Sequence, residues 1–300
     1  MKTNLLILAV YLVCQFGGAA APLTESTFTE VINDVSTLTP DGSATPSKMS
    51  VLLKAPDRVR TGSQSRAELM AADKTITRVG ANTVFSFADQ GRTLNLEKGN
   101  LLFHSPKGLG GGTIRSGGAA AAVLGTTLIV SSTIDDGFKV ILLEGEGSVT
   151  LANGQSAVLH AGQMVYVLPG GTRFSPILDI NLAKLVSGSL LINGFSHELS
   201  SLPFIFRAIH DQTAQLTSGS LTDTGRPADA YLFPPVPGNG LDAQEHGTYQ
   251  VAIPAPITPS QIESLYGSGQ ANSGSPTPGS SGGSGLVPIS NYQPGSNQPP

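Results

Sequence analysis

The sequence predicts an all-β domain, a sandwich- or solenoid-like arrangement of short antiparallel strands, followed by two short helices and a disordered tail. Three observations support this fold class. Short apolar segments rich in β-branched residues recur along the chain, turn residues separate them, and a helical period appears only after Pro176. Short strands at spacings of about 8 to 12 residues are typical of sandwiches, barrels and solenoid-like domains. No repeat is regular enough to define a formal solenoid.

The first 20 residues have the three parts of a secretory signal peptide. Lys2 supplies the basic start, residues 5–13 form an apolar core, and small residues precede the expected cleavage after Ala20. Cleavage one residue later would leave Pro22 directly after the cut. The apolar core is shorter than the roughly 20 residues that span a bilayer, and an uncleaved membrane anchor is the alternative.

Cys14, the only cysteine, lies within this predicted signal peptide, and Val13 before it does not fit a lipoprotein signal. The mature chain would then have no thiol, which excludes disulfides and thiolate metal sites. No second hydrophobic span follows. We therefore expect a periplasmic or extracellular protein with no stable membrane span.

The stretch from Gly117 to Val130 is the expected centre of the β-domain. Its four alanines, Ala119–Ala122, favour a helix by propensity alone. Glycines flank them, however, and the β-branched run Thr126–Val130 follows at once. That run indicates a buried strand, and the small side chains before it indicate a place where two backbones approach closely.

Strands of weaker pattern are expected on both sides of this centre, separated by turn residues such as Asp89–Gly91. Asn153-Gly154 is the strongest hairpin signal in the chain. Residues 107–112 are expected to be a flexible connection. The expected flanking strands are Phe28–Val35, Val51–Leu53, Ala67–Ala71, Thr75–Val79, Val84–Phe87, Thr93–Leu96, Leu101–His104, Phe138–Leu143, Ser148–Leu151, Ala157–Leu159 and Met164–Leu168.

Beyond Pro176 the apolar residues repeat at helical spacing. Asp179 is expected to cap a short helix, and a longer helix is expected to start at Ser200 or Ser201 with Pro203 in its first turn. We expect an apolar stripe of the longer helix to pack on the β-domain. That stripe consists of Leu202, Phe206, Ile209, Thr213 and Leu216.

After this helix the chain becomes rich in Pro, Gly and Ser, with few apolar anchors, which predicts disorder. The predicted organisation is therefore a signal peptide (1–20), a β-domain (27–171), a helical extension (177–217) and a disordered tail (218–300).

Six short motifs resemble, in order, the FecR-type domain of bacterial envelope proteins. They are Arg60–Leu69, Thr77–Gly80, Gly99–Phe103, Ala122–Thr127, Val140–Gly145 and Ala161–Met164. Each motif alone is weak, but six in the right order are specific. The resemblance covers about Thr27–Gly171 and implies the β-fold and an envelope location. Asp179–Ser201 looks like an extension found in some secreted members.

The best-known members of that family relay a signal from an outer-membrane receptor to a sigma factor. They have a cytoplasmic anti-sigma segment, one membrane span, this β-domain and a small receptor-contacting domain. The present sequence has instead a predicted signal peptide and a predicted disordered tail. A component of a transmembrane, sigma-factor regulatory system is therefore the alternative function that the resemblance implies.

No catalytic, cofactor or metal site is expected. Lys107 precedes the glycines of its loop, whereas a Walker loop needs lysine after the last glycine. Gly279–Gly283 matches the nucleophile elbow formally but lies in the predicted tail. The five histidines are scattered; His104 and His160 could meet in space, but a metal site needs a third ligand. Asp135–Gly137 is expected to be a turn rather than a calcium loop.

Glu144 and Glu146 lie two residues apart and would share a face of a regular strand, as a glycosidase pair does. Aromatic residues make up only 6% of the chain and there is no Trp, which does not favour a carbohydrate cleft. We expect both to be solvated charges at a sheet edge. A carbohydrate-active enzyme is the weakest functional alternative.

Charge is distributed unevenly. Residues 48–115 contain eleven Lys and Arg against five Asp and Glu, whereas the chain as a whole has a net charge of −4. A basic segment in an acidic protein favours an anionic partner; ordinary solvated surface is the alternative. The candidate anionic-partner face consists of Arg66, Lys74, Arg78 and Arg92. The predicted function is a non-catalytic cell-envelope protein that binds an envelope protein or an anionic polymer, and no nucleic acid.

Overall fold

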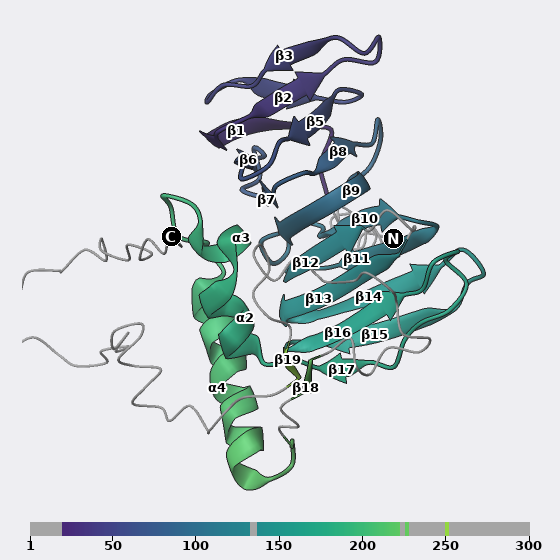
Figure 1. The fold of residues 1–300 in the computed structure, drawn as a ribbon, viewed down its shortest axis with the longest axis vertical. Coiled ribbons are helices and arrows are strands. Elements are labelled where there is room, and N and C mark those ends of the chain that lie inside the picture. Colours follow the sequence, from purple (N-terminus) through teal and green to yellow (C-terminus); the bar gives the residue numbers. More distant parts are fainter. Residues whose placement is uncertain (1–19, 133–136, 223–225, 228–249, 252–300) are drawn as a thin grey trace, which may run out of the picture. The chain divides into compact units, whose positions relative to one another are not determined.

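The computed structural model describes residues 20–132, 137–222, 226–227 and 250–251 (Figure 1). The chain divides into two units, 1–259 and 260–300, and every described residue belongs to the first. All but one residue of the predicted signal peptide therefore lies outside the described residues, as do residues 135–136 and the motif Gly279–Gly283. Within the predicted tail, β18 (Arg226–Pro227) pairs antiparallel with β19 (Gln250–Val251).

Two sheets form the β-domain and share one strand. Sheet A contains, in spatial order, β4 (Leu52–Lys54), β1 (Glu25–Ile32), β6 (Arg66–Met70), β7 (Ile76–Val79), β9 (Thr93–His104), β12 (Thr127–Ser132), β13 (Phe138–Glu144), β16 (Gln163–Val167) and β17 (Leu178–Asp179). Sheet B contains β3 (Ala44–Pro46), β2 (Val35–Leu38), β5 (Arg58–Thr61), β8 (Val84–Phe87), β9, β10 (Gly112–Ser116), β11 (Ala119–Val123), β14 (Glu146–Leu151) and β15 (Ser156–His160).

The chain passes back and forth between the sheets, usually after two strands. β10 and β11 lie in sheet B, β12 and β13 in sheet A, β14 and β15 in sheet B, and β16 and β17 in sheet A. Neighbouring strands are antiparallel except for β9 and β10. The fold is therefore all-β and solenoid-like, as predicted from the short, turn-separated strands.

The core of the β-domain lies between the two sheets. It combines residues of sheet A, such as Phe103 and Leu142, with residues of sheet B, such as Ile114 and Val149. All four side chains are buried. A Cβ at Gly112 of sheet B would lie 2.4 Å from the Phe103 ring, so the sheets approach closely there.

β9 corrects one strand prediction, because Thr93–Leu96 and Leu101–His104 form a single strand of 12 residues. Its first half pairs with β8 and β10 in sheet B, and its second half pairs with β7 and β12 in sheet A. Gly99 lies between the halves with a φ of +88°, which glycine adopts without a Cβ penalty. The strand therefore changes sheets without ending.

The central stretch is also divided differently from the prediction. Ala119–Val123 is a strand in its own right, β11, and β12 begins only at Thr127. Between them Gly125 has a φ of +69°, and a Cβ on it would lie 2.6 Å from Lys107 Cα. The predicted close approach of two backbones therefore occurs at this glycine. The pattern also missed β2, β3, β5, β10 and β17.

Three helices cover the central part of the outer face of sheet A: α2 (Leu182–Gly188), α3 (Leu190–Asn193) and α4 (Leu202–Ser218) (Figure 1). Sheet residues that point away from the inter-sheet core are fully buried beneath them; these are Leu102, Ile129, Ile141 and Tyr166. The helices contribute Leu182, Leu185, Leu191, Ile205 and Ile209, which are also buried. The β-domain and the helices thus form three layers: sheet B, sheet A and the helices.

The helix boundaries follow the predicted signals with two differences. Asn181, rather than Asp179, caps α2 by accepting a hydrogen bond from the Lys184 backbone N–H, and α3 was not predicted. α4 begins after Ser201 with a proline in its first turn, as predicted. Its buried residues are Ile205, Ile209, Gln212 and Thr213, whereas Leu202, Phe206 and Leu216 of the predicted stripe are half-buried. Among the described helices, none is long and apolar enough to cross a bilayer.

Candidate functional site

Arg78 was predicted to face solvent as part of a basic surface, and this prediction is wrong. Its side chain is 0% exposed, and its Nε donates a 2.8 Å hydrogen bond to Glu68 Oε2. Strand alternation does point it away from the inter-sheet core, but the helical layer covers that face of sheet A. Its remaining donors bond to the backbone oxygens of Leu191 (3.2 Å), Ile192 (2.8 Å) and His197 (2.6 Å).

The Arg78 site is a connection between layers rather than a surface for a partner. The guanidinium carbon lies 4.4 Å from the centre of the Phe195 ring, and Thr29 donates a 2.7 Å hydrogen bond to Glu68 Oε1. Burial lowers the pKa of Arg78, and the hydrogen bond and charge of Glu68 oppose that shift. The ion pair therefore fastens α3 and the segment after it to β6 and β7.

The other predicted basic residues do not form one face either. Arg66 is half-buried and donates its Nε to the Gly194 backbone oxygen at 3.3 Å. The Arg92 side chain is 9% exposed and pairs with Asp73 at 2.7 Å; it also bonds to the backbone oxygens of residues 21 and 111. Only Lys74 is exposed. Three of the four cations thus connect segments of this chain to one another.

A pocket of about 360 Å³ lies where α4 passes the end of β13, and we call it the α4 pocket. Charged side chains of both signs line it, together with one exposed aromatic ring. The lining residues used below are Lys107, Glu144, Asp179, Phe204, Arg207 and Asp211. Lys107 comes from the β9–β10 connection, Glu144 and Asp179 from sheet A, and the others from α4. The pocket therefore exists only because the helical layer packs on the β-domain.

Glu144 ends β13 beside two polar cross-strand neighbours. The register places Thr127 opposite both His104 on β9 and Glu144 on β13. Thr127 Oγ1 donates to Glu144 Oε1 at 2.9 Å and lies 2.9 Å from His104 Nδ1. Because the hydroxyl proton is used toward Glu144, His104 Nδ1 is the donor in the second bond.

Burial shifts His104 and Glu144, the two titratable side chains bonded to Thr127, toward their neutral forms. It lowers the pKa of His104 to about 4. It raises the pKa of Glu144, against the opposing effects of the Thr127 hydrogen bond and the Lys107 charge. The expectation that Glu144 is a solvated edge charge is therefore wrong: the residue is 3% exposed. Glu146 is exposed as expected, and it lies 3.5 Å from His160.

The sequence contained one signal for the hydrogen-bonded group of His104, Thr127 and Glu144. All three are polar residues at the ends of strongly apolar strands, where a polar side chain is often part of a functional site. Their proximity could not be predicted, because it depends on the register of three strands. Among the residues that the structure describes, no three His, Cys, Asp or Glu side chains form a group that could hold a metal ion.

The outer face of sheet B is open where the outer face of sheet A is covered. A shallow groove of about 730 Å³, which we call the β11 groove, crosses β10, β11, β14 and β15, and Ala122 of β11 is among its lining residues. Leu124 at its border is 80% exposed and Val158 is 50% exposed. Apolar side chains are thus accessible along this groove.

Comparison with known proteins identifies a domain within this chain. Residues 57–147 match the family model described as FecR protein. The matched segment runs from just before β5 into β14, so it includes the central strands of both sheets. No curated protein matches the sequence significantly.

Two similar solved structures are crystal structures of a candidate anti-sigma factor from Parabacteroides distasonis ATCC 8503, at 1.65 and 2.50 Å resolution. The sequence identities are 18% and 17%, and both TM-scores are 0.35. Each alignment covers 39% of this chain and 57% of the other chain. The present chain thus spans little more than half the length of those proteins.

Proposed function

We propose that this chain, which carries a FecR domain over residues 57–147, is a non-catalytic binding component of a sigma-factor regulatory system. The FecR match is the observation that carries the proposal. The family resemblance implies a relay between an envelope receptor and a sigma factor. In this proposal the β-domain contributes by binding a protein, not by transforming a substrate.

The layered architecture supports sheet B as the surface for that protein. Helices α2–α4 bury the outer face of sheet A over β9, β12, β13 and β16, so a partner cannot reach that part of the sheet without displacing them. The β11 groove offers accessible apolar side chains at Leu124 and Val158. Exposed apolar groups in a groove are typical of protein interaction sites.

An anionic polymer is less well supported as the partner than a protein. That reading needed a face of clustered free cations, but Arg66, Arg78 and Arg92 are bonded within the chain. Lys74 alone is a single exposed charge, which contributes little to binding at physiological salt.

The proposal includes export, with the mature chain starting at Ala21 in the periplasm or the medium. N-terminal sequencing of the protein recovered from these fractions tests this part. A retained Met1 in a membrane fraction would contradict it.

The regulatory proposal is tested by deleting the gene in the source organism and measuring all transcripts. We expect the transcripts of one sigma-factor regulon to change and the full-length chain to restore them. Restoration should fail with Ala122→Glu, which places a charge in the β11 groove. Ala214→Glu, an exposed position on α4, is the matched control and should restore them. The proposal fails if no sigma-dependent transcript responds to the deletion.

A further inference from the structure

The α4 pocket has a property that the binding of a protein to sheet B does not explain. Lys107 and Arg207 line it as cations, and three carboxyl groups, those of Glu144, Asp179 and Asp211, line it as well. Among the described residues, no ion pair joins either cation to any of these carboxyls. Opposite charges therefore share one small hollow without a direct ion pair between them, although the charge of Lys107 acts on Glu144 across it.

The cation at Lys107 is held in place by an aromatic ring. Its Nζ lies 4.8 Å from the centre of the Phe204 ring, and that ring is 43% exposed. A cation–π contact of this kind fixes a flexible lysine side chain without consuming its charge. Lys107 therefore remains available to an anionic group that enters the pocket.

The carboxyl group at Glu144 is held in place by hydrogen bonds. The residue is 3% exposed, and its Oε1 accepts from Thr127, whose hydroxyl accepts in turn from His104. The backbone of Thr127 and the charge of Lys107 also act on this carboxyl, and Glu144 lines the pocket. A buried carboxyl that hydrogen bonds hold in position beside a cavity is a preorganised acceptor for a donor group.

The base of the pocket is rigid as well. Gln212 of α4 donates its Nε2 to the Ile180 backbone oxygen at 2.7 Å and accepts from the Leu182 backbone N–H at 3.0 Å. These bonds tie α4 to the segment before α2. Gly145 and Ala161 contribute small lining groups beside it, which leaves room for a ligand of a few heavy atoms.

We propose that the α4 pocket binds a small zwitterion, a free α-amino acid. Its ammonium group donates to Glu144 Oε2, and its carboxylate pairs with Lys107 and Arg207. Phe204 supplies the apolar wall for the side chain. A volume of about 360 Å³ is at the lower end for ligand pockets and suits a molecule of this size.

Isothermal titration of the full-length chain with the 20 standard L-amino acids, each alone, tests the proposal. We expect at least one to bind, and we expect its N-acetyl and methyl-ester derivatives to bind at least about tenfold more weakly. Each derivative removes one of the two charges, and loss of one charge-assisted hydrogen bond amounts to that factor or more. Failure of all 20 to bind at 10-millimolar concentration, on the order of the weakest affinities of interest, would overturn the proposal.

Two variants locate the binding. Glu144→Gln keeps an oxygen for the Thr127 hydrogen bond but removes the charge, and Arg207→Gln removes one cation. Both should weaken binding at least about tenfold at an unchanged melting temperature. Arg58→Gln, at an exposed arginine outside the pocket, is the control and should bind as the wild type does. Wild-type affinity in both pocket variants would also refute the site.

This inference does not depend on the regulatory function. The titration measures a purified protein and would succeed or fail whatever the transcripts of the deletion strain do.

Discussion

At Glu68 and Arg78, two ionised side chains are withdrawn from water and bonded to one another, and Arg78 also donates to three backbone oxygens. Removing charges from water costs several kcal/mol per ion, so such a pair adds little net stability. Removing one partner of the pair, however, lowers the stability strongly, because the charge of the other partner stays buried without compensation. The pair therefore acts chiefly on the position of α3 and of the segment that follows it.

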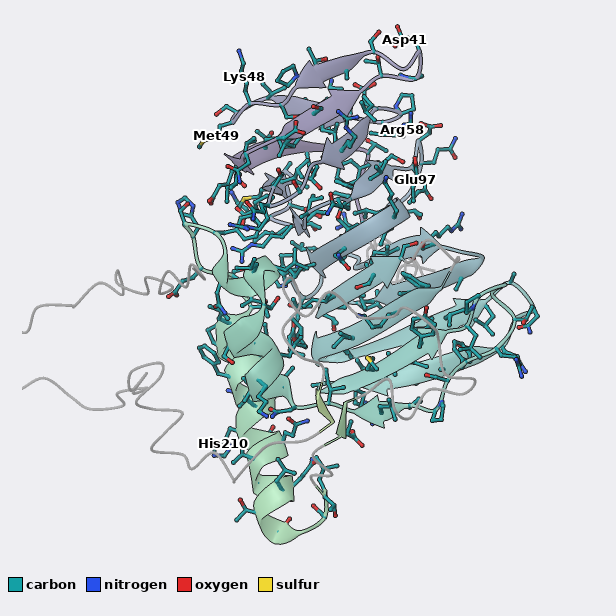
Figure 2. The ribbon with its side chains drawn as sticks, viewed as in Figure 1. Asp41, Lys48, Met49, Arg58, Glu97 and His210 are labelled. Carbon is teal, nitrogen blue, oxygen red and sulfur yellow. The ribbon has the colours of Figure 1, made fainter. Side chains whose placement is uncertain are left out.

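Arg78→Met should destabilise the protein by about 3 to 5 kcal/mol, because it leaves Glu68 buried without its partner. Arg58→Met is the matched control. Arg58 pairs with Glu97, and both are labelled in Figure 2; their distance is 3.4 Å, and the two side chains are 38% and 46% exposed. An exposed pair contributes at most about 1 kcal/mol. Urea denaturation measures both. Equal losses in the two variants would contradict the role assigned to Arg78.

His104 makes stability depend on pH in a defined direction. Its pKa is lowered to about 4 in the folded protein from a usual value of 6.5. Below pH 6.5 the unfolded chain binds a proton at this residue and the folded protein does not. The free energy of unfolding should therefore fall between pH 6.5 and pH 4, by up to about 3 kcal/mol from this group. The raised pKa of Glu144 acts in the opposite direction, because it favours the folded state as pH falls.

His104→Gln tests this effect, since glutamine retains an amide donor for Thr127 but does not titrate. Denaturation at pH 7 and pH 5 should show a smaller loss of stability in the variant than in the wild type. His160→Gln, at an exposed histidine, should behave as the wild type does. If His104→Gln loses as much stability at pH 5 as the wild type, His104 does not control the acid response.

The limit of sequence reasoning at this scale is visible at Arg78. Strand alternation directs its side chain away from the inter-sheet core. Its exposure could not be predicted, because the groups that cover it lie 113 to 119 residues further along the chain. Three of the four cations of the candidate face, Arg66, Arg78 and Arg92, therefore make contacts within the chain.

Among the elements, β9 and the β11–β12 connection depend on glycines with positive φ. Gly99 allows one strand to belong to both sheets, and Gly125 allows the chain to pass from sheet B to sheet A against Lys107. The sequence showed these glycines, but a glycine within an apolar pattern predicts a break, a bulge or a close approach equally well. Only the pairing partners distinguish these outcomes, and hydrophobic pattern does not contain them.

Gly125→Ala should destabilise the protein by about 2 kcal/mol more than Gly118→Ala does. Both glycines have positive φ, +69° and +79°, so the backbone penalty is similar. A Cβ at Gly125 would meet Lys107 Cα at 2.6 Å, whereas one at Gly118 would meet nothing within 4 Å. The difference therefore isolates the steric cost of the close approach. Equal melting temperatures for the two variants would show that the connection can move apart at no cost.

In the described part of the chain as a whole, the helical layer completes the β-domain. The fold class followed from the sequence because short, turn-separated strands differ clearly from a helical period. The helical layer was only partly predictable. The apolar stripe of α4 indicated packing on the β-domain, but the apolar residues on the outer face of sheet A could not be distinguished in the sequence from residues of the inter-sheet core. Residues such as Ile129 and Ile141 make β12 and β13 apolar on both faces, which is a signal for a strand covered on both sides.

Truncation tests whether residues 177–217 are a separable extension, as the predicted organisation has it, or a required layer. A chain of residues 21–176 would expose the outer face of sheet A, including Leu102, Ile129, Ile141 and Tyr166, all 0% exposed in the structure. It would also leave Arg78 without its backbone acceptors. Each large apolar side chain contributes about 1.5 to 3 kcal/mol on burial. The contribution of four such side chains is therefore comparable with the whole free energy of unfolding of a typical domain.

We therefore expect the chain 21–176 to aggregate or to bind a hydrophobic dye without a cooperative melting transition. A chain of residues 21–221 keeps all three layers and the Gly219 cap of α4, and it should melt within a few degrees of the full-length protein. Circular dichroism on heating distinguishes the two. A cooperative transition of the chain 21–176 at the full-length melting temperature would mean that the helices do not contribute to the stability of the β-domain. A much lower melting temperature of the chain 21–221 would mean that residues beyond 221 contribute to the fold.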